Sequence, residues 1–190
     1  MDSYIRYLYQ RGIEWLLLRD VPLLRVGGFA VIDMAVLERA YPECDFTRRD
    51  PGPHLDVVNN ILRDFQRGLG VNGVYGMLYD SRPEGPGQYR VFPRFYNDDL
   101  SAARLPWEFQ CGTGSIAVAL VLAHEGRLAL KRRPVQVSLE WGSYRTTPDP
   151  YGIRTSHLEL ELQDRTLTSA TFSHSVVEIL AEGTLTLPGY

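Results

Sequence analysis

One short run of residues constrains this chain more than any other part of it. Cys111 stands directly before Gly112-Thr113-Gly114-Ser115, and an apolar, alanine-rich segment follows as far as His124. Glycines permit a tight turn and the close approach of another group. Because the apolar segment stops before Gly126, the pattern predicts a helix over roughly residues 113–124 with Cys111 at its N-terminus.

The predicted helix is apolar nearly all round, which is typical of a buried helix. A thiol at its N-terminus lies beside unpaired backbone N–H groups and the positive end of the macrodipole, which favour the thiolate. The same N–H groups can bind a carboxylate or another anion. Cys111 is therefore the candidate catalytic residue, and Gly112, Thr113, Gly114 and Ser115 are candidate substrate-binding residues. The alternative for Cys111 is a small buried apolar residue at a helix start.

The run resembles the active-site motif of the diaminopimelate epimerase / proline racemase superfamily, which includes the PrpF-like isomerases. Further, weaker resemblances extend over most of residues 21–190, but only to the C-terminal half of the family's usual two-half chain. They are an opening strand, a following helix, the end of the motif helix, a last strand and a tail, found at Val26–Asp33, His54–Leu69, Ala123–Leu128, Ser169–Phe172 and Glu182–Leu185.

The resemblance implies a cofactor-independent isomerase, epimerase or racemase that acts on a small carboxylate-containing metabolite. In the resembling enzymes the motif cysteine is one of two facing acid/base groups. One removes a proton from the carbon next to a carboxylate, and the other protonates the opposite face. For this chain the resemblance implies an α+β half-domain, with a mostly antiparallel sheet wrapped around a central buried helix. We expect no cofactor and no metal.

The chain departs from the family in its second acid/base group, which normally comes from the other half. Cys44 lies in a proline-containing stretch with no glycine turn or helix start after it. Glu108 is the nearest carboxylate before Cys111, and its simpler role is a solvated charge. We therefore expect the site to form between two copies of the domain in a homodimer, or with a complementary half-domain chain.

Two other interpretations stay open. The same scaffold could serve a dehydratase, double-bond isomerase or cyclase of a biosynthetic pathway, with one thiol or none. A non-catalytic half-domain that binds a carboxylate or a partner protein is the rival from another class.

Composition fits one globular domain over residues 1–190, with residues 1–20 as an N-terminal extension or strand. The chain is 44% hydrophobic and 23% charged, and its net charge of −3 gives no reason to expect a nucleic acid or an anionic membrane as partner. The two cysteines lack metal-ligand spacing and lie far apart in sequence, which favours a reduced compartment. We expect a cytoplasmic protein.

Local patterns predict the remaining elements. Apolar residues recur at steps of three and four from Leu55 to Leu69, which indicates an amphipathic helix. Alternating residues in 135–141 and 157–163 indicate antiparallel strands with one wet face. Other strands are expected at 13–18, 23–32, 74–79 and 89–95, with a break at Val21-Pro22 and a bulge or tight backbone approach at Gly27-Gly28. Loops are expected at 41–53, 81–87 and 97–106.

Overall fold

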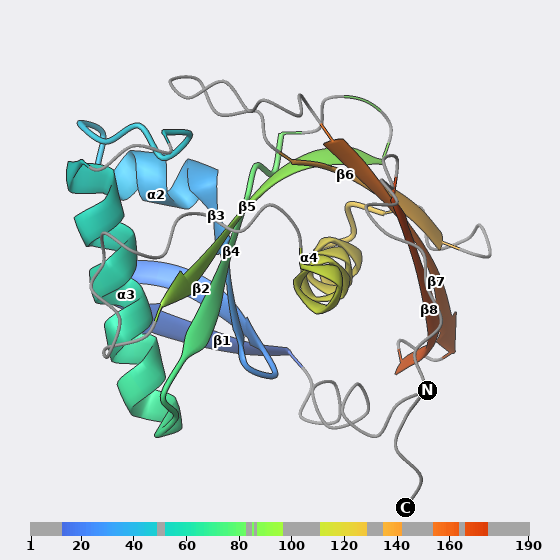
Figure 1. The fold of residues 1–190 in the computed structure, drawn as a ribbon, viewed down its shortest axis with the longest axis horizontal. Coiled ribbons are helices and arrows are strands. Elements are labelled where there is room, and N and C mark those ends of the chain that lie inside the picture. The colour runs from blue at the N-terminus through green and yellow to red at the C-terminus, as the bar shows by residue number, and fades with distance from the viewer. Residues whose placement is uncertain are drawn as a thin grey trace, which may run out of the picture.

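The computed structural model describes residues 13–48, 52–82, 85, 87–96, 111–128, 135–141, 154–163 and 166–174. In these residues eight strands form one sheet in which the spatial order follows the chain, and helices lie against both of its faces (Figure 1). The chain is therefore an α+β protein, as predicted. The strands are β1 (Ile13–Leu18), β2 (Val21–Val26), β3 (Phe29–Asp33), β4 (Val74–Tyr79), β5 (Gln88–Tyr96), β6 (Val135–Trp141), β7 (Arg154–Gln163) and β8 (Thr166–His174).

The sheet is mostly antiparallel, and its two parallel pairs mark where helices enter the chain. Only β3–β4 and β5–β6 are parallel. A parallel pair needs a crossover connection. The first crossover carries α2 (Met34–Ala40) and α3 (Pro53–Leu69), and the second carries α4 (Gly112–His124).

The two crossovers bury opposite faces of the sheet. In β3, Phe29 and Val31 belong to the core that contains α4, whereas Ala30 and Ile32 belong to the core that contains α2 and α3. Because β3 is covered on both faces, these four residues form a continuous apolar run. In Figure 1, α4 lies between the strands β2–β4 and the strands β6–β8.

The later strands have only one buried face. In β7, Leu158 and Leu160 are buried in the core with α4, and His157 and Glu159 are exposed. β6 and β7 are antiparallel. The predicted solvent-exposed face of β6 and β7 is confirmed, because no helix among the described residues covers the side of these strands that points away from α4.

Two predictions about the N-terminal strands are wrong. Residues 23–32 are not one strand: β2 and β3 form an antiparallel pair, and the chain reverses at Gly27-Gly28, where Gly27 has a φ of 58°. The expected bulge is therefore a tight turn. Pro22 does not interrupt a strand either, because it lies inside β2. The pairing of β2 with β3 begins only at Leu24, so Pro22 lies outside that pairing.

Helix α2 was missed by the sequence analysis. Its N-cap is Asp33, whose carboxylate accepts a hydrogen bond from the Ala35 N–H at 2.9 Å. Met34 and Leu37 are its buried residues. The N-cap and the three-residue apolar step were visible signals, but seven residues are too few for a periodic pattern to stand out.

The amphipathic helix is confirmed as α3, which ends at Gly70 with a left-handed φ of 65°. The predicted loop at 97–106 and the tail at Glu182–Leu185 lie outside the described residues. No helix in the described part of the chain combines the length and the apolar character needed to cross a membrane.

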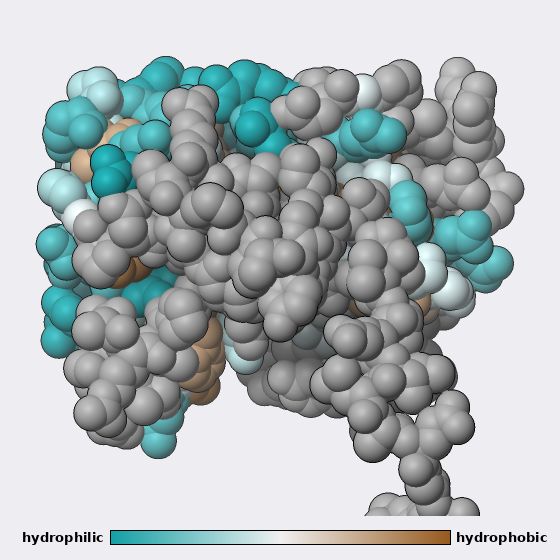
Figure 2. Space-filling view, turned by 45° about the horizontal axis from the view of Figure 1, so that its top comes forward, coloured by the Kyte–Doolittle hydropathy of each residue, from teal (hydrophilic) through white to brown (hydrophobic). Residues whose placement is uncertain are grey.

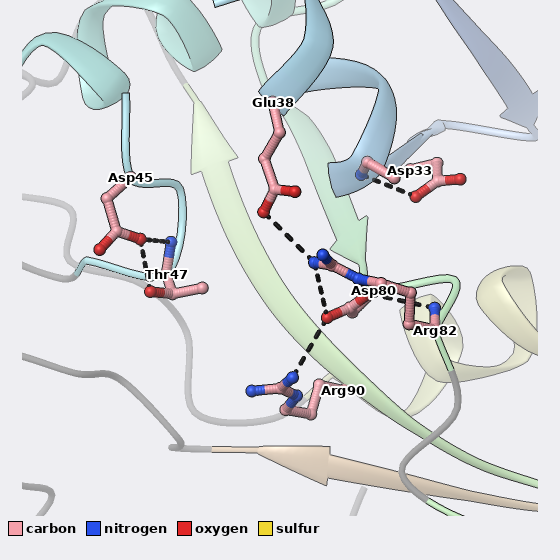
Figure 3. Close-up of polar contacts among 8 residues, drawn as sticks. Asp33, Glu38, Asp45, Thr47, Asp80, Arg82 and Arg90 are labelled. Atoms are coloured by element: carbon pink, nitrogen blue, oxygen red, sulfur yellow. Dashed lines mark hydrogen bonds and ion pairs between the residues drawn. The ribbon is translucent and has the colours of Figure 1, made fainter. Parts of the chain in front are cut away.

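A buried carboxylate joins α2, β4 and β5 (Figure 3). Asp80 is 1% exposed and accepts hydrogen bonds from Arg82 Nε at 2.7 Å and from Arg90 Nη2 at 3.2 Å. Arg82 also contacts Glu38 of α2 at 3.3 Å. Burial raises the pKa of Asp80, but the hydrogen bonds from Arg82 and the charges of both arginines outweigh burial, so the pKa lies below its ordinary value.

We expect Asp80→Asn to lower the free energy of unfolding by about 1–3 kcal/mol at pH 7, because the arginines lose a buried ionised partner. A carboxyl group whose pKa is lowered in the folded state stabilises the fold at pH values above its ordinary pKa. This stabilisation is lost as the pH falls through the lowered pKa. Urea unfolding should therefore show a smaller difference between variant and parent at pH 3 than at pH 7.

Glu14→Gln is the matched control, because Glu14 forms an exposed ion pair with Arg25 at 3.3 Å. It should change stability by less than about 0.5 kcal/mol at either pH. A loss in Asp80→Asn that is the same at both pH values would contradict the prediction.

Candidate functional site

Cys111 is the N-cap of α4. Its backbone is extended, with φ −141° and ψ 103°, and its Sγ accepts a hydrogen bond from the Gly114 N–H at 3.3 Å. The thiol thus takes the place of the Ser, Thr, Asp or Asn oxygen that usually caps a helix. The predicted helix with Cys111 at its N-terminus is confirmed, since α4 begins at Gly112 and ends at His124.

The turn that follows Cys111 is held by hydrogen bonds within itself. The backbone N–H and the hydroxyl of Ser115 both donate to the Cys111 carbonyl at 2.8 Å. The Thr113 hydroxyl lies 3.6 Å from the Cys111 Sγ. Two of the four candidate N–H groups, those of Gly114 and Ser115, are therefore engaged by Cys111 itself, and Gly112 and Thr113 are half-buried at the start of the turn.

Residues from two distant strands lie against this turn. A methyl group on Gly114 would lie 2.5 Å from Sδ of Met77 in β4 and 3.1 Å from the Cys111 Sγ. A methyl group on Gly112 would lie 3.9 Å from the ring of Phe172 in β8. The sequence analysis missed Met77 and Phe172, because no local pattern connects either residue with Cys111.

Polar contacts hold the other end of α4. The Tyr79 hydroxyl of β4 lies 3.1 Å from both carboxylate oxygens of Glu125. Tyr89 of β5 donates to the Arg127 carbonyl at 3.1 Å, and Arg127 Nη1 donates to the Ser81 carbonyl at 3.1 Å. Burial first and the Glu125 charge second raise the pKa of Tyr79 well above its ordinary value, so the phenol stays protonated. These contacts fix how far α4 projects over the sheet, and hence where Cys111 lies.

The structure does not bring Cys44 to Cys111. Cys44 belongs to the core on the α2 and α3 face of the sheet, whereas Cys111 packs against the core on the α4 face. Burial and the neighbouring Glu43 charge raise the pKa of Cys44. Both cysteines are free thiols. The second acid/base group of an isomerase would therefore have to come from somewhere other than Cys44.

Comparison with protein-family models gives no match for this chain, and comparison with curated proteins gives none either.

We expect Gly114→Ala to lower the free energy of unfolding by about 1–2 kcal/mol, because overpacking against buried Met77 outweighs the helix propensity of alanine. Gly112→Ala is the matched control, since the nearest atom to its new methyl is an ordinary contact. It should leave stability unchanged or raise it by up to about 1 kcal/mol. Urea unfolding measures both variants. Equal stabilities would show that Met77 does not limit the approach of the helix.

Proposed function

We propose that this chain is a cofactor-independent isomerase, an epimerase or racemase, that moves a proton at the carbon next to a carboxylate in a small metabolite. The observation that supports it is Cys111 at the N-cap of α4, where the Gly114 N–H donates to its Sγ. A hydrogen bond to sulfur and the positive end of the helix both stabilise a thiolate.

The proposed reaction uses the thiol in two protonation states. The Cys111 thiolate takes the proton from the α-carbon, and the electron pair left behind is delocalised into the substrate carboxylate. A protonated group on the opposite face then donates its proton to the same carbon and inverts the centre. The N–H groups at the start of the turn, at Gly112 and Thr113, would stabilise the negative charge that develops on the substrate.

The same proposal includes an epimerase-like half-domain and a shared site. α4 is buried among residues of β2–β5 on one side and of β6 and β7 on the other, which fits a sheet wrapped around a central helix. A closed twofold dimer is the commonest way for one chain to supply both sides of a site. In it the two Cys111 thiols titrate as a coupled pair, one protonated and one not.

A non-catalytic, carboxylate-binding half-domain is the second candidate. The engagement of the Gly114 and Ser115 N–H groups by Cys111 favours a domain without catalysis, because fewer donors are left to stabilise a developing negative charge. A dehydratase or cyclase on the same scaffold would share the Cys111 site without needing the second thiol.

The first test measures proton transfer directly. We expect the parent chain, incubated in D2O with a panel of α-substituted carboxylic acids, to place deuterium on the α-carbon of at least one of them. Cys111→Ser should reduce this exchange by about 10²–10⁴-fold, the usual contribution of an acid/base group. Mass spectrometry provides the measurement. Cys44→Ser is the control and should exchange as the parent does, because Cys44 lies on the other face of the sheet.

Iodoacetamide alkylation followed against pH separates the two candidates. An activated Cys111 should react at half its maximal rate at a lower pH in the folded chain than in the chain unfolded by urea. A folded thiol that reacts no more readily than the unfolded one, together with no deuterium exchange, would favour the non-catalytic domain.

The second test concerns the shared site. We expect a dimer by light scattering, and a short bifunctional thiol reagent should join Cys111 to its copy. Cys111→Ser should dimerise equally well but give no cross-linked product. A dimer whose parent chain cannot be cross-linked would shift the proposal to a complementary partner chain.

A further inference from the structure

Among the residues that the structure describes, strand β1 is an edge of the sheet with large apolar side chains. Within this part of the chain it pairs with β2 alone, and it stands first in the strand order. Trp15 is 60% exposed and Leu17 is 67% exposed. On the face that Figure 2 shows, the described surface is mostly hydrophilic, with hydrophobic side chains in small separate patches. Natural sheets protect such edges with prolines, bulges or charges, and the centre of β1 has none of these.

The side chains of β1 divide between the two faces. Ile13 packs with the core that contains α4, and Leu16 and Leu18 pack with the core on the α3 side. Since side chains alternate along a strand, Trp15 and Leu17 lie on the α4 face with Ile13.

The backbone of the same residues faces the open edge. Antiparallel strands alternate between pairs that exchange hydrogen bonds and pairs that do not. Leu17 lies opposite Pro22, which has no N–H to exchange. Leu17 and, two residues away, Trp15 therefore direct their N–H and C=O groups away from β2. The groups available for a further strand belong to the two residues whose side chains are most exposed.

We propose that β1 is an interface with a second copy of this chain, paired antiparallel about a twofold axis at Leu16. This register places Trp15 opposite Leu17 of the second copy, twice, on the α4 face. The backbone N–H and C=O groups of Trp15 and Leu17 both point out from the edge, so in this register they can bond to each other across the two copies. A twofold axis at Leu17 would instead place Glu14 opposite Asp20 of the second copy, and two carboxylates directly opposite each other destabilise a strand pair.

The apolar area that the two copies bury sets the expected strength of their association. A buried aromatic side chain removes about 150–250 Å² of surface, and Trp15 and Leu17 are already partly covered. Two copies of these residues supply only part of the roughly 1,600 Å² of a standard interface. The pairing should therefore depend on concentration, and Trp15 should dominate it, since tryptophans carry much of the energy in small interfaces.

This interface differs from the shared Cys111 site proposed above and goes beyond it. Neighbouring strands lie about 4.8 Å apart, and on this side of the sheet α4 lies mainly against β2, β3 and β4. Edge pairing would leave the two α4 helices on one face of the joined sheet, roughly 20–25 Å apart by the strand spacing. A chain that used only the edge would be a dimer, and one that used both surfaces would be a tetramer.

Light scattering over a dilution series tests the interface. The double variant Trp15→Glu, Leu17→Glu should have half the mass of the parent, because like charges then face each other across the pair. The matched control is Val71→Glu, at the third exposed large apolar residue, which lies between α3 and β4 and should leave the mass unchanged. Mixing the double-glutamate variant with Trp15→Lys, Leu17→Lys should restore the parent mass. That recovery would show that both variants are folded.

Disulfide formation tests the register. In a Cys111→Ser background, Leu16→Cys should oxidise to a cross-linked dimer, because the two copies of residue 16 lie about 4.5 Å apart at a pair without hydrogen bonds. Leu18→Cys, on the same face of β1, should cross-link at least tenfold less. A parent mass that survives the glutamate substitutions, or equal cross-linking at both positions, would overturn the proposal.

Discussion

The burial of α4 is the interaction on which the rest of this structure depends. Its residues are apolar on all sides, so no single sheet face could cover it. The described strands supply two walls, with Met77 of β4 on one side and Leu158 of β7 on the other as members of one core. β5 takes part in both, since Gln88–Arg90 pair with β6 while Val91–Tyr96 pair with β4.

The same packing determines where the thiol lies. Polar contacts at Glu125 and Arg127 hold the C-terminal end of α4 to β4, to β5 and to Ser81, which follows β4 and Asp80. At the other end, Gly114 lies so close to Met77 that a methyl group added to it would force the Met77 side chain to shift. A helix fixed at both ends leaves its N-cap little freedom, which is the preorganisation that electrostatic stabilisation of a transition state requires. Cys111 thus owes its position to residues that are distant in sequence, such as Met77 and Tyr79 of β4.

The two faces of the sheet have different roles. The α2 and α3 face is closed, with Cys44 inside it and the Asp80 ion pairs at its rim. The α4 face carries the candidate site and, at its edge, the exposed Trp15. Both proposed contacts with a second copy involve this face.

The sequence by itself determined the helix after Cys111, the amphipathic helix α3 and the one-sided strands β6 and β7, because each is specified by a local period of apolar residues. It also marked Cys111 as the candidate catalytic residue, since a thiol before a glycine turn is a local pattern. It did not separate β2 from β3, because the turn at Gly27 depends on a backbone conformation, and most residues on either side of it are apolar.

Only the tertiary structure decided which face Cys44 occupies, which residues surround the thiol and which strand is left at the edge. These follow from strand order and pairing between distant segments, and no local period encodes them. Met77 and Phe172 meet at one turn because the sheet places β4 and β8 on either side of α4.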